Sequence, residues 1–368
     1  MCRLPVDDHM LREILLRLPP QPSSLPRASA VCKRWLAIVT DAKFQHQFRT
    51  HHREPPLLGA FVCIDEEIVF TPALDSPDHI HHQQFDLGRY SGSGPRALLD
   101  CRHGRVLIKD KVRQEIVVCD PIAGERHRVA IKLDFSFAFL NGAVLCAAGD
   151  FGHVHDASCH SSLFKVVLTS MRGEDRRHVT CVYSSETGTW GNLISSEASC
   201  VLPGEPAVLV GNRLYWLCIQ DHIIEIEMDE ASITVIGSPT PHGPFYLKRQ
   251  IIQADGGAVG FAIFSYPRFE TWQRKVNGHG DSTWVPWKTI KLDRIRGLPQ
   301  VEEEMKGKVI VRGYEEDTDV MFLRVNGSVY MVQLKSSQAK KLYGNLNGHY
   351  HPFRSFYTPR DYASLVLI

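Results

Sequence analysis

The richest set of potential metal ligands in this sequence is "GHVHDASCH", residues 152–160. The stretch combines histidine, aspartate and cysteine side chains, which are ligand types found in protein zinc sites. The five candidates are His153, His155, Asp156, Cys159 and His160. A zinc site of recognisable spacing needs a second ligand pair, and none follows in the sequence. We therefore expect a polar surface loop here, with no metal and no cofactor.

Two short motifs match fragments of catalytic signatures. "DFG" at 150–152 occurs without any other kinase element. "SGSGP" at 91–95 is neither a phosphate-binding loop nor a nucleophile elbow. An enzyme would also need carboxylates or histidines that converge on one site, and no such set can be picked from the sequence. We therefore predict no catalytic residues and a protein that is not an enzyme.

Two groups of side chains are better suited to binding than to catalysis. "GYEEDTDV", residues 313–320, concentrates carboxylates that either attract a basic segment of a partner or form a solvated loop between strands. Trp272, Trp284 and Trp287 either line a recognition surface or pack inside the fold. For both groups the simpler interpretation is structural: a solvated loop for the carboxylates, and packing inside the fold for the tryptophans.

The bulk composition shows no electrostatic specialisation. The 368 residues include 42 basic and 41 acidic side chains, which gives a formal net charge of +1. This balance gives no reason to expect nucleic acid or a membrane surface as a partner. Ten cysteines occur without a Cys-x-x-Cys pair, which favours a reducing compartment. Because Asp7 and Asp8 stand where a signal peptide needs an apolar core, we expect an intracellular protein of the cytoplasm, the nucleus or both.

Residues 1–50 have helical periodicity and a broad apolar surface. A helical wheel places five side chains within a stripe of roughly 140°: Met10, Leu11, Ile14, Leu15 and Leu18. Further short amphipathic segments follow, so we predict a unit of three or four helices. A helical unit of about 45 residues buries too little surface to be comfortably stable alone. It either caps the domain that follows or leaves part of its apolar surface for another protein.

Beyond a polar junction at 51–56, the periodicity changes to short strands separated by turn residues. Five dipeptides predict tight hairpin turns: His103-Gly104, Asn141-Gly142, Gly211-Asn212, Gly256-Gly257 and Asn326-Gly327. A second strand–turn–strand pattern recurs between them at intervals of roughly 40 to 65 residues, about the length of one propeller blade. We predict a mainly β protein with a small α-helical N-terminal unit, followed by a β-propeller of about six or seven blades.

"LPVDDHMLREILLRLP" and "VCKRWLAIV", residues 4–19 and 31–39, carry a resemblance to a known family. Their order and spacing resemble an F-box, which we assign to residues 1–50. In that family the F-box docks on a Skp-type adaptor, which connects to a cullin and a RING subunit in an SCF ubiquitin ligase. The resemblance implies eight positions that meet the adaptor or support those that do: Leu4, Pro5, Leu11, Ile14, Leu15, Val31, Cys32 and Trp35.

The rest of the chain resembles the F-box-associated β-propellers of plant F-box proteins. The matching stretches include "VVCDPIAGERHRV", "VGNRLYWL" and the tail that begins at Asp319. The resemblance implies a substrate-recruiting propeller at 57–368 and an SCF-type substrate-recognition subunit that binds an unknown target protein. The alternative is an adaptor-bound scaffold that does not support ubiquitin transfer. We expect the aromatic segment "HPFRSFYTP", 351–359, to close the propeller by packing.

Overall fold

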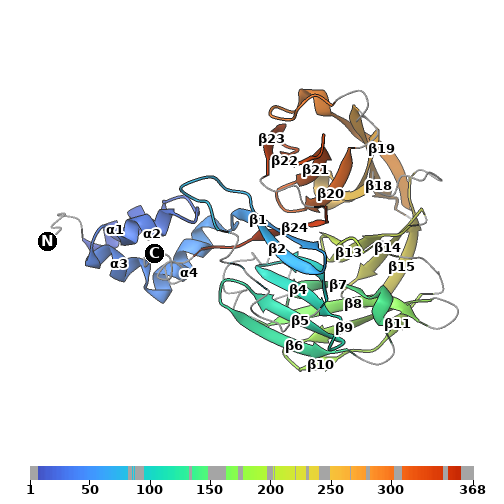
Figure 1. Ribbon diagram of the computed structural model, residues 1–368, viewed down its shortest axis with the longest axis horizontal. Coiled ribbons are helices and arrows are strands. Elements are labelled where there is room, and N and C mark those ends of the chain that lie inside the picture. Colours follow the sequence, from blue (N-terminus) through green and yellow to red (C-terminus); the bar gives the residue numbers. More distant parts are fainter. Residues whose placement is uncertain are drawn as a thin grey trace.

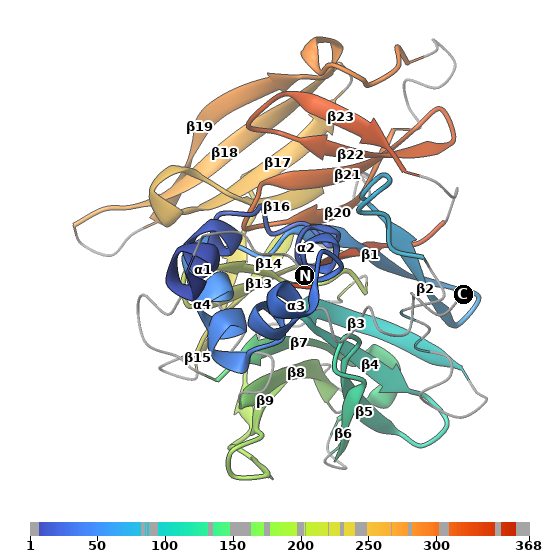
Figure 2. The same ribbon diagram turned by 90° about the vertical axis from the view of Figure 1, so that its left-hand side faces the viewer.

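The computed structural model describes most of the chain. The described residues are 7–81, 85, 87, 95–131, 135–147, 163–172, 177–196, 202, 204–219, 221–228, 232–239, 249–265, 267–278, 282–301, 309–342 and 347–357. Within them, a small helical unit is followed by a ring of β-sheets. Figure 1 and Figure 2 show the helical unit lying over one face of this ring.

In the described residues, four α-helices make up the helical unit: α1 (Asp8–Leu16), α2 (Ser24–Ser29), α3 (Lys33–Val39) and α4 (Ala42–His52). The Asp7 side chain caps α1 by accepting a hydrogen bond from the Met10 amide at 2.7 Å. Asp41 caps α4 in the same way, and its ion pair with Arg12 at 2.8 Å joins α1 to the start of α4. None of the helices described here is long and apolar enough to cross a membrane.

Across the described ranges, the strands form the six antiparallel blades of a β-propeller. Blade 1 contains β24 (Tyr350–Arg354), β1 (Leu57–Ile64) and β2 (Glu67–Pro72). Blade 2 contains β3 (Arg96–Arg102), β4 (Arg105–Asp110), β5 (Glu115–Asp120) and β6 (Glu125–Ala130). Blade 3 contains β7 (Asn141–Cys146), β8 (Phe164–Arg172), β9 (Arg177–Ser184), β10 (Thr189–Trp190) and β11 (Ile194–Ser195).

The second half of the ring has three blades of four strands. Blade 4 contains β12 (Val208–Val210), β13 (Arg213–Leu217), β14 (His222–Glu227) and β15 (Ser232–Gly237). Blade 5 contains β16 (Arg249–Gln253), β17 (Val259–Ser265), β18 (Arg268–Val276) and β19 (Ser282–Lys291). Blade 6 contains β20 (Ile310–Glu315), β21 (Val320–Val325), β22 (Ser328–Gln333) and β23 (Gln338–Lys341).

The ring closes by pairing the two ends of the propeller sequence. The C-terminal strand β24 pairs with the N-terminal strand β1, and as the inner strand of blade 1 it also contacts the inner strands β20 and β3 of the two neighbouring blades. Phe353 and Tyr357 are buried in the core beside β1, β2 and β3. The prediction that the C-terminal aromatic segment closes the propeller by packing is therefore confirmed for its described part.

The predicted hairpin turns fall at different places within the blades. His103-Gly104 connects the first strand of blade 2 to the second, and Asn326-Gly327 connects the second strand of blade 6 to the third. All four residues have positive φ. The predicted turn at Asn141-Gly142 is wrong, because both residues lie buried in the inner strand β7. A Cβ on Gly142 would lie 2.9 Å from the Val167 carbonyl oxygen, so the glycine permits close approach of β7 and β8.

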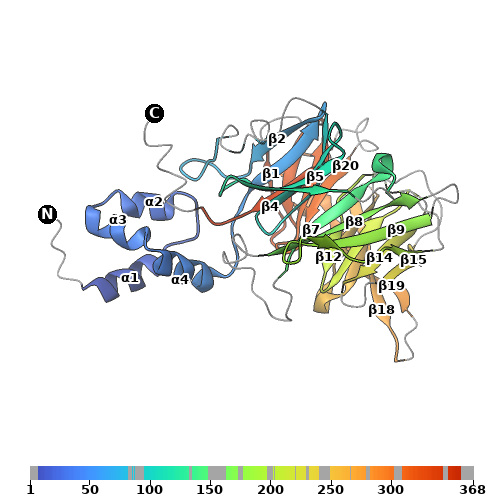
Figure 3. The same ribbon diagram turned by 90° about the horizontal axis from the view of Figure 1, so that it is seen from below.

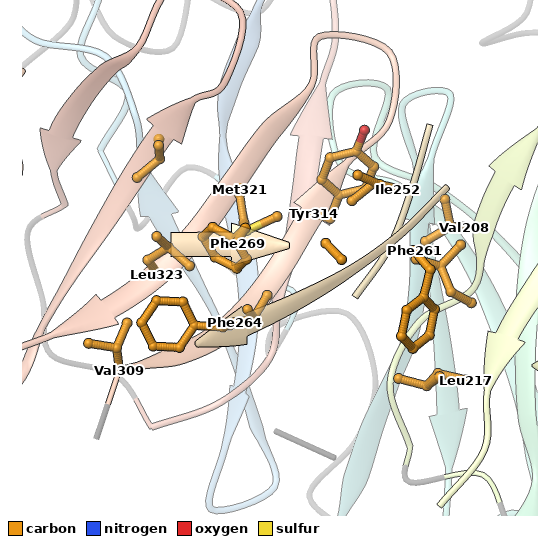
Figure 4. Close-up of a cluster of buried hydrophobic side chains, with 14 of the residues drawn as sticks. Val208, Leu217, Ile252, Phe261, Phe264, Phe269, Val309, Tyr314, Met321 and Leu323 are labelled. Atoms are coloured by element: carbon orange, nitrogen blue, oxygen red, sulfur yellow. The ribbon is translucent and has the colours of Figure 1, made fainter. Parts of the chain in front are cut away.

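The hydrophobic core follows the ring from blade to blade. Figure 4 shows the cluster shared by blades 4, 5 and 6, in which the Phe264 and Phe269 rings lie 5.1 Å apart. Trp272, Trp284 and Trp287 are half-buried and pack against this cluster. The packing interpretation of the three tryptophans is confirmed.

The helical unit is joined to the propeller by two segments and a shared core. Figure 3 shows the chain crossing between the two parts after α4 and again after β24. The segments run side by side, since Arg354 Nε donates to the Pro55 carbonyl at 3.0 Å and the Ser355 amide donates to the Pro56 carbonyl at 3.3 Å. Phe356, 4% exposed, then inserts into the core of the helical unit.

We expect Phe356→Ala to lower the free energy of unfolding of the helical unit by about 3 kcal/mol, because it removes a buried ring and leaves a cavity. Chemical denaturation followed by hydrogen exchange in α1 and α4 measures the loss. Phe139→Ala, at a ring that is 49% exposed on the propeller, is the matched control and should change stability little. Equal effects of the two variants would contradict the insertion of Phe356.

Candidate functional site

Exposed apolar side chains are concentrated in the helical unit. Among the described residues, nine large hydrophobic side chains are exposed, and four of them belong to the helical unit: Met10, Ile14 and Leu36 on helices and Val31 in the connection between α2 and α3, at 58%, 49%, 44% and 50%. We call these four side chains the apolar set. An ion pair between Asp8 and Arg34 at 2.7 Å holds the first turns of α1 and α3 together. Where exposed apolar side chains form a continuous patch, they are typical of a protein-binding surface.

The eight positions implied by the sequence resemblance divide into exposed and buried ones. Leu11 and Leu15 lie in the core of the helical unit, with 2% and 0% exposure. Ile14 and Val31 are exposed, whereas Cys32 and Trp35 are half-buried. The remaining two, Leu4 and Pro5, lie outside the described residues. Met10 and Leu36 were not among the eight, although the helical wheel places Met10 on the apolar stripe of its helix.

A second candidate site is a cavity of about 440 Å³ at the centre of the propeller ring, which we call the central pocket. Its walls are the C-terminal ends of the inner strands β3, β16, β20 and β24. Its mouth is lined by Arg53, Glu54 and Pro55, which follow α4. The central pocket therefore lies between the propeller and the helical unit.

One guanidinium group ties the blades together inside the central pocket. Arg102, at the end of β3, pairs with Asp100 at 2.5 Å and with Glu316 of blade 6 at 2.7 Å. It also donates to the carbonyl of Ala207, next to blade 4, at 2.5 Å. Asp100 in turn accepts from the Val144 amide of blade 3 at 2.9 Å. Four blades thus meet at one buried ion-pair network.

The acidic stretch at 313–320 is only partly a solvated loop: Asp317 is exposed, whereas Gly313, Tyr314 and Glu315 are buried at the end of β20. Glu315 is 5% exposed and accepts hydrogen bonds from the Thr318 amide and hydroxyl. Arg354 pairs with Asp317 at 2.7 Å and with Glu315 at 3.5 Å. The structure therefore places these carboxylates in the wall of the central pocket, which the spacing of the acidic run did not indicate.

Burial shifts the protonation of the groups that line the central pocket. It raises the pKa of Glu316 to about 7, against the opposing effect of Arg102. It lowers the pKa of His351 to about 3, and His349 and Arg102 act in the same direction. His351 is 3% exposed, and within the described part of the chain its Nδ1 has no hydrogen-bond partner. The imidazole of His351 is therefore neutral at physiological pH.

A histidine that is buried and neutral in the folded chain makes the free energy of unfolding decrease as the pH falls. Below its unfolded pKa of 6.5, His351 binds a proton in the unfolded chain and not in the folded one. From pH 7 to pH 5, the free energy of unfolding should therefore fall by about 2 kcal/mol more for wild type than for His351→Asn. Chemical unfolding at both pH values measures this difference. The exposed His222→Asn is the control. An identical pH dependence of wild type and His351→Asn would contradict the buried neutral state.

The other sequence candidates add no site. The histidine-rich stretch 152–160 and most of "SGSGP" lie outside the described residues. The residues that are described contain no group of histidine, cysteine or carboxylate side chains able to hold a metal ion. The seven cysteines among them form no disulfide bond with one another.

Comparisons with protein families identify both parts of the chain. A family model described as "F-box protein AT5G49610-like, beta-propeller" matches residues 97–360, and the F-box domain model matches residues 1–47. No curated protein matches the chain in sequence.

Several solved structures are similar at low identity. They include the nidogen/laminin complex, with 13% identity, 80% of this chain and 96% of that chain covered, and a TM-score of 0.40. The hydrazine synthase of Kuenenia stuttgartiensis has 9% identity, coverage of 77% and 78%, and a TM-score of 0.39. The WD40 domain of SCAP from fission yeast has 14% identity, coverage of 71% and 55%, and a TM-score of 0.36. At these scores the similarity has no bearing on function.

Proposed function

The chain belongs to the family of F-box proteins with an AT5G49610-like β-propeller, and we propose that it is the substrate-recognition subunit of an SCF-type ubiquitin ligase. In this proposal residues 1–50 dock on a Skp-type adaptor, which connects to a cullin and a RING subunit. Residues 57–368 bind the target protein. The role is non-catalytic and intracellular, with neither nucleic acid nor membrane as a partner.

The observation that carries the proposal is the apolar set on a helical unit whose core is already filled. Leu11, Leu15 and Phe356 complete that core from within the chain. Met10, Ile14 and Val31 remain about half exposed, so they are available to a second polypeptide. We therefore assign Ile14 and Val31 to direct adaptor contact, and Leu11, Leu15, Cys32 and Trp35 to support of that surface. Leu4 and Pro5 keep the assignment implied by the resemblance to an F-box.

The mechanism is proximity. A receptor that performs no bond chemistry accelerates ubiquitin transfer by raising the effective concentration of a target lysine near the conjugating enzyme. That effect requires a stiff connection between adaptor and target, because a flexible one dilutes the local concentration. Three contacts supply it here: the Phe356 ring in the helical core, the Arg354–Pro55 hydrogen bond, and a hydrogen bond from the Ser23 amide to Asp78 at 2.9 Å.

Reconstitution tests the proposed function. The purified chain is combined with a Skp-type adaptor, a cullin, a RING subunit and the conjugation enzymes, and ubiquitin transfer to proteins captured by the propeller is scored. Adaptor-dependent transfer that is lost when the chain is left out supports the receptor role. A stable adaptor complex that assembles with the cullin but transfers no ubiquitin contradicts it and identifies the scaffold alternative instead.

A further inference from the structure

The central pocket has the size and the access of a ligand site. Its volume of about 440 Å³ falls in the range of clefts that hold small ligands or single side chains. Asp317 stands at its rim with 59% of its side chain exposed, so the pocket opens to solvent. An occupant would touch Arg53, Glu54 and Pro55 as well as the propeller.

Acidic side chains outnumber basic ones in the lining of the central pocket. Four carboxylates and two guanidinium groups form its ion-pair network: Asp100, Glu315, Glu316 and Asp317 with Arg102 and Arg354. Arg53 and Glu54 at the mouth balance each other. When all these groups are ionised, the lining therefore carries two more negative than positive charges. In a partly dehydrated site, such an excess attracts a cation much more strongly than it would in water.

A residue of the cavity wall carries an unpartnered ring nitrogen. His351 belongs to the pocket wall, is 3% exposed, and its Nδ1 has no hydrogen-bond partner in the described part of the chain. A buried polar atom without a partner is costly and rare, and a neutral imidazole can present an unprotonated nitrogen as an acceptor. A cationic N–H donor that reaches this nitrogen would satisfy it and would offset the excess of carboxylates at the same time.

We propose that the central pocket binds the cationic side chain of an arginine or lysine residue in the target protein. The inference names a feature of the target and thus rests on the proposed function. A guanidinium group suits the pocket best, because its fork of N–H donors pairs with carboxylates in a bidentate manner. The bound side chain lies at the junction of propeller and helical unit.

Calorimetric titration of the full chain with short peptides tests this inference. The probes are acetyl-Gly-Arg-Gly-amide, the same peptide with neutral citrulline in place of arginine, and agmatine as a free small cation. We expect the arginine peptide to bind about tenfold or more tightly than the citrulline peptide. Equal binding of the two peptides, or no binding of either, overturns the inference. Binding of agmatine without binding of the arginine peptide also overturns it, since the ligand would then be a free small cation and not a side chain of a protein.

Two variants assign the binding to the pocket. Asp317→Asn removes a negative charge, and Glu316→Gln removes a carboxyl group that is ionised above its pKa of about 7, so at pH 8 each should weaken binding of the arginine peptide about tenfold. Glu125→Gln removes an exposed carboxylate from β6 and should leave the affinity unchanged. Unchanged affinity in both folded pocket variants overturns the inference. Adaptor binding is measured on the same proteins. A chain that binds the adaptor but not the arginine peptide contradicts only the inference about the central pocket. A chain that binds the arginine peptide but not the adaptor contradicts only the proposed function.

Discussion

Ile14→Asp is expected to abolish binding to a Skp-type adaptor while the chain stays folded. Ile14 is 49% exposed, so a carboxylate at this position is solvated in the free protein. In the complex the same carboxylate would be buried without a partner, which costs about 3 kcal/mol or more and reduces affinity over about a hundredfold. Truncation to alanine, which removes only apolar contact, should cost about 2 kcal/mol if Ile14 is central in the interface.

The control for this prediction is Val112→Asp, which places the same charge on an exposed propeller side chain. It should bind the adaptor like wild type. Affinity is measured by titration and folding by circular dichroism. A folded Ile14→Asp chain with wild-type affinity would remove Ile14 from the adaptor surface. Leu15 is unsuitable for this test, because its side chain is fully buried and a charge there would unfold the helices.

Arg102→Ala is expected to destabilise the propeller by about 4 kcal/mol. The variant leaves Asp100 and Glu316 as buried carboxylates without their cation. It also removes the hydrogen bond to the Ala207 carbonyl and so loosens the link between blades 2, 4 and 6. Protonation of one carboxylate offsets part of this loss, so the variant should become relatively more stable at pH 5 than at pH 7.

Chemical unfolding of the full chain, followed by the fluorescence of its tryptophans, measures this loss. Arg268→Ala, at an exposed position of β18, is the matched control and should stay within about 0.5 kcal/mol of wild type. If Arg102→Ala and Arg268→Ala unfold at the same denaturant concentration, the buried network does not hold the blades together.

The architecture was predictable because its signals are local. The Asp7 and Asp41 caps, the change of periodicity after residue 56 and the glycine turns all act within a few residues. The wrong turn at Asn141-Gly142 shows where local signals fail. Its glycine is required by the packing of β7 against β8, a constraint that a dipeptide does not reveal.

The functional surfaces were only partly predictable because tertiary packing decides them. The helical wheel placed Leu11, Ile14 and Leu15 on one stripe, but contact with the other helices and with Phe356 buries only Leu11 and Leu15. The central pocket was not predicted at all. Arg102 and Glu316 are 214 positions apart and meet only because the inner strands converge at the ring's centre. The acidic run was the one available signal.

Hydrogen exchange of the chain with and without a purified Skp-type adaptor tests the central claim most directly. We predict a one-to-one complex in which backbone amides of α1 and of the segment from Val31 to Leu36 become protected, with blades 2 to 6 unchanged. Absence of a complex, or protection confined to the propeller, would contradict the claim that the exposed apolar side chains of the helical unit form the adaptor-docking surface.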